Sequence, residues 1–194
     1  LRVPDKLTLQ YINKVFTEIY DAWNSDTFFS LIKAFELPTN NQIKTFSRGM
    51  RMKAALTIAL SHDAKLLILD EATAGMDVSG REHVLEILED YLGDDRAILI
   101  SSHISEDIEQ LATQLVFMRD GRIILKESKE VLLSQYGIID QPVEHFNISN
   151  EYLIATRRRN DRQISLVNNY QKVPDAQPLK TIDDATKIIM RGEV

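Results

Sequence analysis

The chain has 194 residues, of which 44% are hydrophobic and 27% charged, and its formal net charge is −6. This length can bury the core of one globular domain and a small appendage, and the acidic balance argues against a general nucleic-acid binder. The chain contains no cysteine, which excludes disulfides and thiolate metal sites and is typical of a cytoplasmic protein.

Aromatic and aliphatic residues recur at helical spacing through the first forty residues. Thr8 is predicted to cap a first helix, and a second helix is expected to be capped by Asp26 and to end before Pro38. Most of the apolar positions are expected to pack in a core: Leu9, Ile12, Phe16, Ile19, Tyr20, Trp23, Phe28, Phe29, Leu31, Ile32 and Phe35.

Ser47 is predicted to begin a third helix that runs to about Ser61. Its inner face is expected to comprise Ala54, Ala55, Ile58 and Ala59. The amino end of such a helix favours an anion, because its backbone N–H groups are free and the helix dipole is positive there. Gly49 would let the backbone approach a ligand closely. A plain serine N-cap is the alternative interpretation.

A strand is predicted at residues 65–69, and it runs directly into the adjacent carboxylates Asp70 and Glu71. A continuously apolar run is typical of a parallel strand covered on both faces, and ligands bind at the carboxyl ends of such strands. Two acids there suit complementary tasks, one holding Mg²⁺ and the other polarising an attacking water. A strand that simply enters an acidic turn is the alternative.

The elements predicted after this turn alternate between helix and strand. They are a helix at 80–92, a strand at 97–101, a helix at 105–111, and strands at 115–118 and 122–126 joined by a turn at Asp120-Gly121. This alternation favours a parallel sheet whose last two strands turn antiparallel. His103 directly follows the strand at 97–101.

The character of the chain changes beyond Gly137. Two alternating stretches, at 152–156 and 163–167, and an amphipathic helix at 182–190 predict a small α+β appendage. The basic run at 157–159 either binds a phosphate or a partner or is a solvated strand end.

The order of these motifs resembles that of the ATP-binding cassette (ABC) ATPases, over about residues 7–126. The matching motifs are the signature loop Phe46-Ser47-Arg48-Gly49-Met50, a Walker B strand ending in Asp70 and Glu71, a D-loop ending in Asp77, and the switch histidine His103. The loop departs from the commonest Leu-Ser-Gly-Gly-Gln form at Phe46, Arg48 and Met50. Ala72 replaces a proline that most members of the family have.

The resemblance implies a role for each of these residues. Asp70 would hold Mg²⁺, Glu71 would act as the catalytic base, and His103 would hydrogen-bond the γ-phosphate of ATP. The loop residues Ser47, Arg48, Gly49 and Met50 would contact ATP held by a second subunit, and Asp77 would couple the two sites. No Gly-x-x-x-x-Gly-Lys-Ser/Thr loop occurs in the sequence, so the chain looks like the back part of a nucleotide-binding domain.

The resemblance implies an α/β fold: a partial RecA-like P-loop NTPase core with a parallel sheet, an ABC α-helical subdomain and a small α+β carboxy-terminal appendage. We expect the helical subdomain and signature helix at residues 1–62, the carboxy-terminal part of the ATPase core at 63–137, and the accessory domain at 138–194.

We expect the ATP-hydrolysing subunit of a bacterial ABC transporter that exports a small molecule, antibiotic or peptide. Its expected cofactors are ATP and Mg²⁺, and its expected partners are a second ATPase subunit, identical or different, and transmembrane permease subunits, with no nucleic acid. No apolar stretch approaches the ~20 residues that cross a bilayer, so the expected location is cytoplasmic, on the inner face of the cell membrane through a partner.

Two alternatives stay open. Without a phosphate-binding loop, the fragment alone is predicted to be inactive and could act as an interaction or regulatory fragment. It could also be the head of a non-transport ABC ATPase, although no heptad coiled coil precedes the signature loop.

Overall fold

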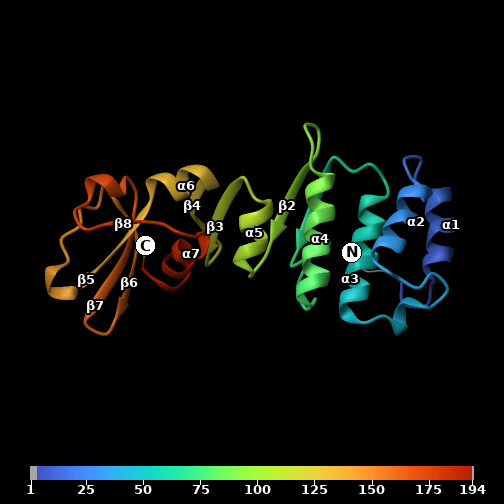
Figure 1. The fold of residues 1–194 in the computed structure, drawn as a ribbon, viewed down its shortest axis with the longest axis horizontal. Coiled ribbons are helices and arrows are strands. Elements are labelled where there is room, and N and C mark those ends of the chain that lie inside the picture. The colour runs from blue at the N-terminus through green and yellow to red at the C-terminus, as the bar shows by residue number, and fades with distance from the viewer. Residues whose placement is uncertain (1–3, 194) are drawn as a thin grey trace. The chain divides into compact units, whose positions relative to one another are not determined.

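The computed structural model describes residues 4–193, and the chain forms two compact units (Figure 1). One unit ends at Ile104 and the other begins at Ser105. The boundaries expected at 62/63 and 137/138 fall within these units, and that functional division stays a prediction. Among residues 4–193, no helix is both long and apolar enough to span a bilayer.

Four helices and one parallel strand pair make up the first unit (Figure 1). The helices are α1 (Leu9–Ile19), α2 (Ser25–Ala34), α3 (Arg48–Leu60) and α4 (Val78–Tyr91), with a short 3-10 turn, η1 (Ile43–Thr45), before α3. The predicted cap of α1 is confirmed, because Thr8 Oγ1 accepts a hydrogen bond from Tyr11 N at 3.2 Å. The predicted cap of α2 is wrong. Asn24 Oδ1 accepts from Thr27 N at 2.9 Å, and Asp26 lies in the first turn.

The aromatic cluster of α1 and α2 is mainly core, as predicted. Phe28 and Phe35 are buried, and the half-buried indole of Trp23 donates a hydrogen bond to Asn13 Oδ1 at 2.9 Å. The expectation is wrong for Ile19, Tyr20 and Phe29, which are exposed. Ile19 and Tyr20 lie at the carboxyl end of α1, where the chain turns away before α2 begins, and Phe29 lies on the outer side of α2.

Strands β1 (Leu66–Asp70) and β2 (Ala97–Ser101) pair in parallel, and the register sets Asp70 opposite Ser101. On one face of the pair, Leu66, Ile68 and Leu99 are 53%, 71% and 59% exposed. The expectation that both faces are covered is therefore wrong, because no element within residues 4–193 buries this one. The other face, which includes the buried Leu67, is turned into the unit.

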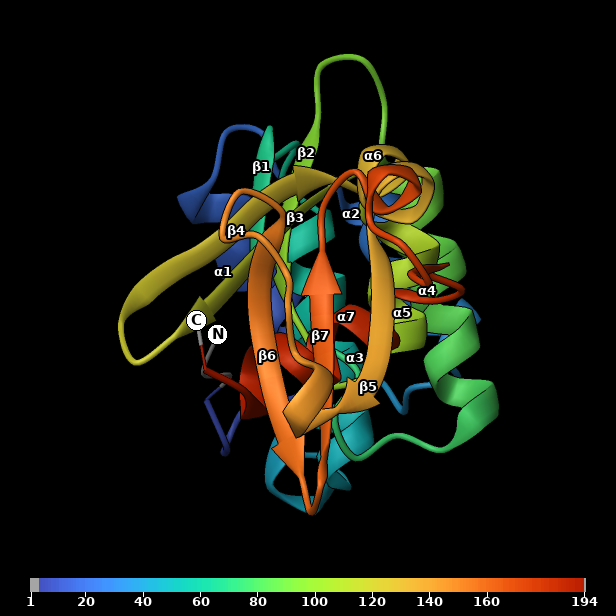
Figure 2. The ribbon, with the colours of Figure 1, turned by 90° about the vertical axis from the view of Figure 1, so that its left-hand side faces the viewer.

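The second unit contains two antiparallel sheets. The first pairs β3 (Gln114–Arg119) with β4 (Arg122–Ser128), and the second has the strand order β6-β7-β5-β8. Figure 2 shows β6, β7 and β5 side by side. The strands of the second sheet are β5 (Gly137–Pro142), β6 (Leu153–Arg159), β7 (Arg162–Val167) and β8 (Gln177–Pro178); the helices are α5 (Ser105–Leu111), α6 (Lys129–Gln135) and α7 (Ile182–Arg191), with 3-10 turns η2 (Val143–His145) and η3 (Tyr170–Lys172).

Helix α7 joins the two sheets of this unit through one hydrophobic core. Leu115 and Phe117 of β3 are buried in the same cluster as Leu166 of β7 and Ile189 of α7. Polar contacts secure both ends of the helix. Ile182 N donates to Glu109 Oε1 at 2.8 Å, and Arg119 Nη1 donates to the carbonyls of Ile189, at 2.6 Å, and Gly192.

Helices α3 and α4 approach closely at Gly80, which is buried. A Cβ atom at this position would lie 2.7 Å from Asp77 Oδ1 and 3.4 Å from Lys53 Nζ. The glycine therefore leaves room for a carboxylate and an ammonium group beside the start of α4.

Replacing Gly80 with alanine tests this packing. A glycine-to-alanine change inside a helix usually stabilises by about 0.5–1 kcal/mol. In Gly80→Ala the methyl group meets only the ends of the Asp77 and Lys53 side chains, and Asp77 is exposed and can rotate away, so a smaller rise, below about 0.5 kcal/mol, is expected in the free energy of unfolding. Urea unfolding measures the change, with Gly93→Ala as the reference, since a Cβ there meets nothing within 4 Å. A large loss of stability in Gly80→Ala alone would contradict this account, because it would show that Asp77 is held rigidly over Gly80.

Candidate active site

The predicted acidic residues lie at the carboxyl ends of β1 and β2. Asp70 ends β1 and Ser101 ends β2. The Ser101 hydroxyl donates a hydrogen bond to Asp70 Oδ1 at 2.6 Å. Because side chains alternate along a strand, both residues continue the exposed face that carries Ile68 and Leu99. The site thus begins where this apolar face ends.

Glu71 has an unusual backbone conformation that its surroundings hold in place. Its φ is +52°, in the left-handed region that residues other than glycine rarely occupy. Its N–H donates to the Ser101 carbonyl at 3.1 Å and lies 3.2 Å from the Ser101 hydroxyl, while its carbonyl accepts from Ala74 N at 3.0 Å. Such a conformation costs on the order of 1–3 kcal/mol and persists where neighbours over-determine it. It sets the direction of the Glu71 carboxylate.

His103 faces that carboxylate from the segment after β2. Its Nε2 lies 3.2 Å from Glu71 Oε1, and the imidazole is 92% exposed whereas the Glu71 side chain is 31% exposed. The structure therefore brings Asp70, Glu71 and His103 to one edge of the strand pair. The imidazole is open to solvent, and the carboxylate beside it is partly sheltered.

The oxygen atoms at this edge suit Mg²⁺. The Asp70 carboxylate is exposed, and the Ser101 hydroxyl lies beside it. Mg²⁺ keeps several waters and is commonly held through one or two carboxylates, so this small oxygen set fits it. No cluster of three or more His, Cys, Asp and Glu side chains that could form a fuller metal cage occurs in residues 4–193.

Ser47 is the N-cap of α3, which is expected both for an anion-binding loop and for the alternative of a plain serine N-cap. Its Oγ accepts a hydrogen bond from Met50 N at 3.2 Å, and the residue is exposed. The first turn of α3 lies beside the turn that follows β1, because a Cβ on Gly49 would be 3.8 Å from Met76 Cγ. The predicted loop and the predicted D-loop residue are thus in neighbouring segments.

Asp77 directly precedes α4 and is exposed. It occupies the N-cap position of that helix, yet its side chain makes no capping hydrogen bond. Its carboxylate instead lies over Gly80, as described above.

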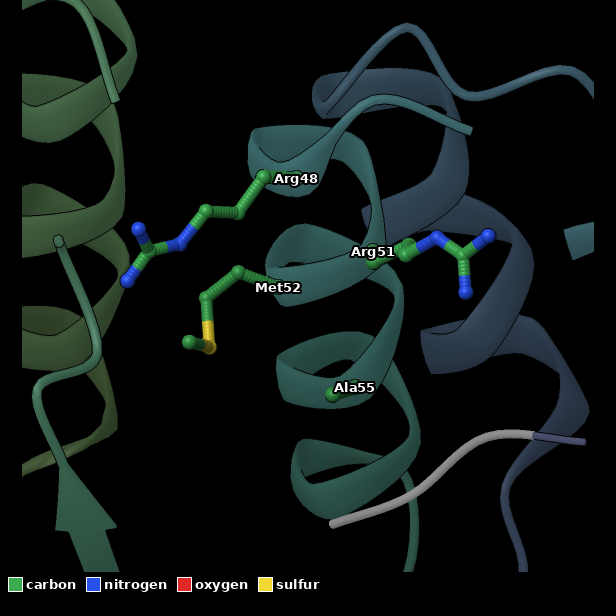
Figure 3. A pocket seen from close by; sticks show the side chains of 4 residues that line it. All are labelled: Arg48, Arg51, Met52 and Ala55. Atoms are coloured by element: carbon green, nitrogen blue, oxygen red, sulfur yellow. The ribbon is translucent and has the colours of Figure 1, made fainter. Parts of the chain in front are cut away.

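A shallow hollow of about 460 Å³ on α3 is lined by Arg48, Arg51, Met52 and Ala55 (Figure 3). Figure 3 shows the Arg48 and Arg51 side chains leaving the helix in opposite directions. Arg51 binds back to its own unit, donating to the Phe46 and Lys44 carbonyls at 3.2 and 2.9 Å and to Asp5 Oδ1 at 2.6 Å. It is a structural cross-link.

Sequence reasoning missed Ser101 and Arg51. Ser101 carried a usable signal, because it is the last residue of an apolar run parallel to the one that ends in Asp70. Arg51 carried none, since its partners lie on a loop and at the start of the chain.

Comparison with solved structures defines the class of fold. The chain superposes on a structure assigned as a cobalt transport ATP-binding protein with a TM-score of 0.62 and 18% identity, over 86% of this chain and 60% of that one. It superposes on an ATP-binding subunit of an ABC transporter with a TM-score of 0.60 and 23% identity, over 68% and 57%. These likenesses confirm the predicted α/β fold of ABC ATPase domains.

Sequence comparison points to the same family. Residues 4–74 match the family model described as ABC transporter. The lantibiotic transport ATP-binding protein SrtF of Streptococcus pyogenes is 37% identical over 116 residues, which are 60% of this chain and 47% of that protein. The linearmycin resistance ATP-binding protein LnrL of Bacillus subtilis is 32% identical over 120 residues, 60% and 38%.

Over about 60% of its length, the chain is thus similar in sequence to ATP-binding proteins of ABC transporters. The chain spans about half the length, or less, of the curated relatives it matches.

The Ser101 hydroxyl can be tested directly. Ser101→Ala removes its hydrogen bond to Asp70 and is expected to lower the free energy of unfolding by about 0.5–1.5 kcal/mol. Ser101→Thr keeps the hydroxyl and is the matched control, with a smaller expected loss. Urea unfolding of the purified variants measures both. An alanine variant as stable as the threonine variant would show that the hydroxyl does not hold the strand ends.

Proposed function

We propose that the chain supplies the Walker B, switch and signature parts of an ATP-hydrolysing ABC transporter subunit. The observation that carries the proposal is the contact between Glu71 and His103 at the strand end that also bears Asp70, with 3.2 Å between Oε1 and Nε2. Two carboxylates and an imidazole gathered at one sheet edge suit phosphoryl transfer, which depends mostly on positioning and charge neutralisation.

In this proposal each side chain has a distinct task. Glu71 is the base, taking a proton from the water that attacks the γ-phosphate, and its fixed left-handed backbone aims the carboxylate. His103 holds Glu71 and donates a hydrogen bond to the phosphate. Asp70, with the Ser101 hydroxyl, would hold Mg²⁺, which neutralises phosphate charge when bound.

The exposed apolar face supports the proposal that the half of the domain that holds the nucleotide is missing from this sequence. Leu66, Ile68 and Leu99 lie open on the side of the strand pair that leads to Asp70. Large exposed apolar patches usually mark an interface. The sequence has no phosphate-binding glycine-rich loop, and in the resembled family that loop lies upstream of the signature loop. We propose that this upstream portion covers the face and brings the phosphates to Glu71.

The partners follow from the same assignment. Ser47, Arg48, Gly49 and Met50 would face ATP held by a second ATPase subunit, and Asp77 would couple the two sites. The subunits would work with a transmembrane permease on the cytoplasmic face of the membrane. The relatives' names support transport of an antibiotic or peptide, since one is a lantibiotic transport protein and another a linearmycin resistance protein. We propose that the direction of transport is export.

A second candidate function is that of an interaction or regulatory fragment. It is favoured by one observation: the sequence lacks the loop that would hold phosphates. Under that proposal the apolar face of β1 and β2 binds a partner, and Glu71 and His103 perform no chemistry.

The base assignment is tested in a protein that carries the phosphate-binding half. Glu71→Gln is expected to lower steady-state ATP hydrolysis by about 10²-fold or more, because the amide cannot accept the proton, while ATP binding is kept. Phosphate release and equilibrium nucleotide binding measure the two effects. Glu86→Gln, at an exposed carboxylate on α4, is the control and should hydrolyse normally. Wild-type turnover in Glu71→Gln would rule the base out.

The purified chain of 194 residues is expected to show no magnesium-dependent ATPase activity by itself. The physical reason is that nothing in its sequence cradles the β- and γ-phosphates. A phosphate-release assay beside a full-length ABC ATPase tests this. Activity that disappears in Glu71→Gln would refute the claim that an essential half is missing.

A further inference from the structure

The first turn of α3 and the turn after β1 contact each other at Gly75, and both Gly75 and its neighbour Arg48 lie at the surface. Gly75 has a φ of +79°, a conformation that glycine adopts freely. A Cβ atom on Gly75 would lie 3.2 Å from Cδ, 3.3 Å from Nε and 3.5 Å from Cζ of Arg48. The end of the Arg48 side chain therefore packs against one side of the Gly75 backbone.

The contacts on either side extend this junction along α3. Gly49 lies against Met76, and Lys53 reaches the space over Gly80 that Asp77 also occupies. Gly75 and Met76 thus meet the first turn of α3, and Lys53 in its second turn lies near the start of α4. Arg48 is the first residue of that helix, so it lies directly beside the Ser47 cap.

The same turn holds Glu71 in place. Ala74 N donates to the Glu71 carbonyl at 3.0 Å, and Met76 N donates to the Thr73 carbonyl at 3.2 Å. Gly75 lies between these two donors. A shift of Gly75 would therefore loosen the hydrogen bond that keeps Glu71 left-handed.

We infer that Arg48 is a positioning residue: by packing against Gly75 it holds the turn at 74–77 against the signature helix, so that the signature loop, Asp77 and Glu71 move as one body. The consequence for catalysis rests on the proposed function, whereas the mechanical link does not. Arg48 acts on the reaction through the turn and not by contact with the carboxylate.

Hydrogen exchange of the purified chain tests the mechanical link. In Arg48→Ala, amides in residues 71–77 are expected to exchange about threefold faster or more, the size of effect typical of contacting residues. Arg51→Ala is the matched control. It removes an arginine of the same helix whose side chain points the other way (Figure 3), so residues 71–77 should exchange as in the wild type while residues 43–46 loosen. Unchanged exchange at 71–77 in Arg48→Ala would overturn the inference.

The reciprocal variant approaches the contact from the other side. Gly75→Ala is expected to push the guanidinium away and to speed exchange at Met50 and Arg51 in the first turn of α3. Gly121→Ala is its control, because Gly121 has a similar φ of +74° but a Cβ there meets nothing within 4 Å. Faster exchange in α3 from Gly75→Ala alone supports the link, and no change in either variant counts against it.

A kinetic measurement separates positioning from stability. In a protein that carries the phosphate-binding half, Gly75→Ala displaces the Arg48 side chain from the turn without removing a group that is proposed to face ATP. It is expected to lower kcat by about tenfold, because small displacements of a catalytic group are costly, whereas Gly121→Ala should keep the wild-type kcat. A wild-type kcat in Gly75→Ala would overturn the catalytic part. If the wild-type protein hydrolyses no ATP, the proposed function fails, and the exchange data still decide the mechanical link.

Discussion

The Ser101 hydroxyl lies between two carboxyl-bearing residues and ties the ends of two parallel strands. It donates to Asp70 and lies within hydrogen-bond distance of the backbone N–H of Glu71. The register of β1 and β2 makes this possible, because it sets Ser101 opposite Asp70. From that anchor the chain turns left-handed at Glu71 and meets His103. Every proposed catalytic distance depends on this junction, since a slip of one residue would turn Asp70 to the opposite face.

The same alternation links the site to the open side of the strand pair. Asp70 and Ser101 belong to the face that carries Ile68 and Leu99, whereas Leu67 is buried on the other face. Whatever covers the exposed leucine and isoleucine side chains must therefore also approach the carboxylate. A single covering element would exclude water from the apolar face and shelter the reacting groups.

Much of this arrangement was predictable from local pattern. The strand that ends in Asp70 and the position of His103 follow from apolar runs that stop at polar residues. The left-handed conformation of Glu71 was not predictable, because glutamate has no preference for it and long-range hydrogen bonds impose it. The contact of Arg48 with Gly75 was equally hidden, since it joins positions 27 residues apart through a side chain whose direction the sequence leaves open.

The elements that were not predicted show a second physical reason why sequence patterns give only part of the fold. Helix α6 and strand β5 are short and adjoin without a clear break, and neither has a strong period. Strand β5 forms because β7 pairs with it along its whole length. The exposure of Tyr20 reflects a related limit, because helical spacing identifies an apolar stripe but not what covers it.

The shared core around α7 limits how the carboxy-terminal segment could have been added or removed. Leu115 and Phe117 of β3 are sealed by Leu166 and Ile189, which come from the last thirty or so residues. Deleting the chain from β5 onward would expose those two side chains to water and would remove the carbonyls to which Arg119 donates hydrogen bonds. The segment from β5 to the carboxyl terminus is therefore needed for the stability of its unit. An evolutionary loss of this segment would require β3 to acquire a new apolar cover at the same time.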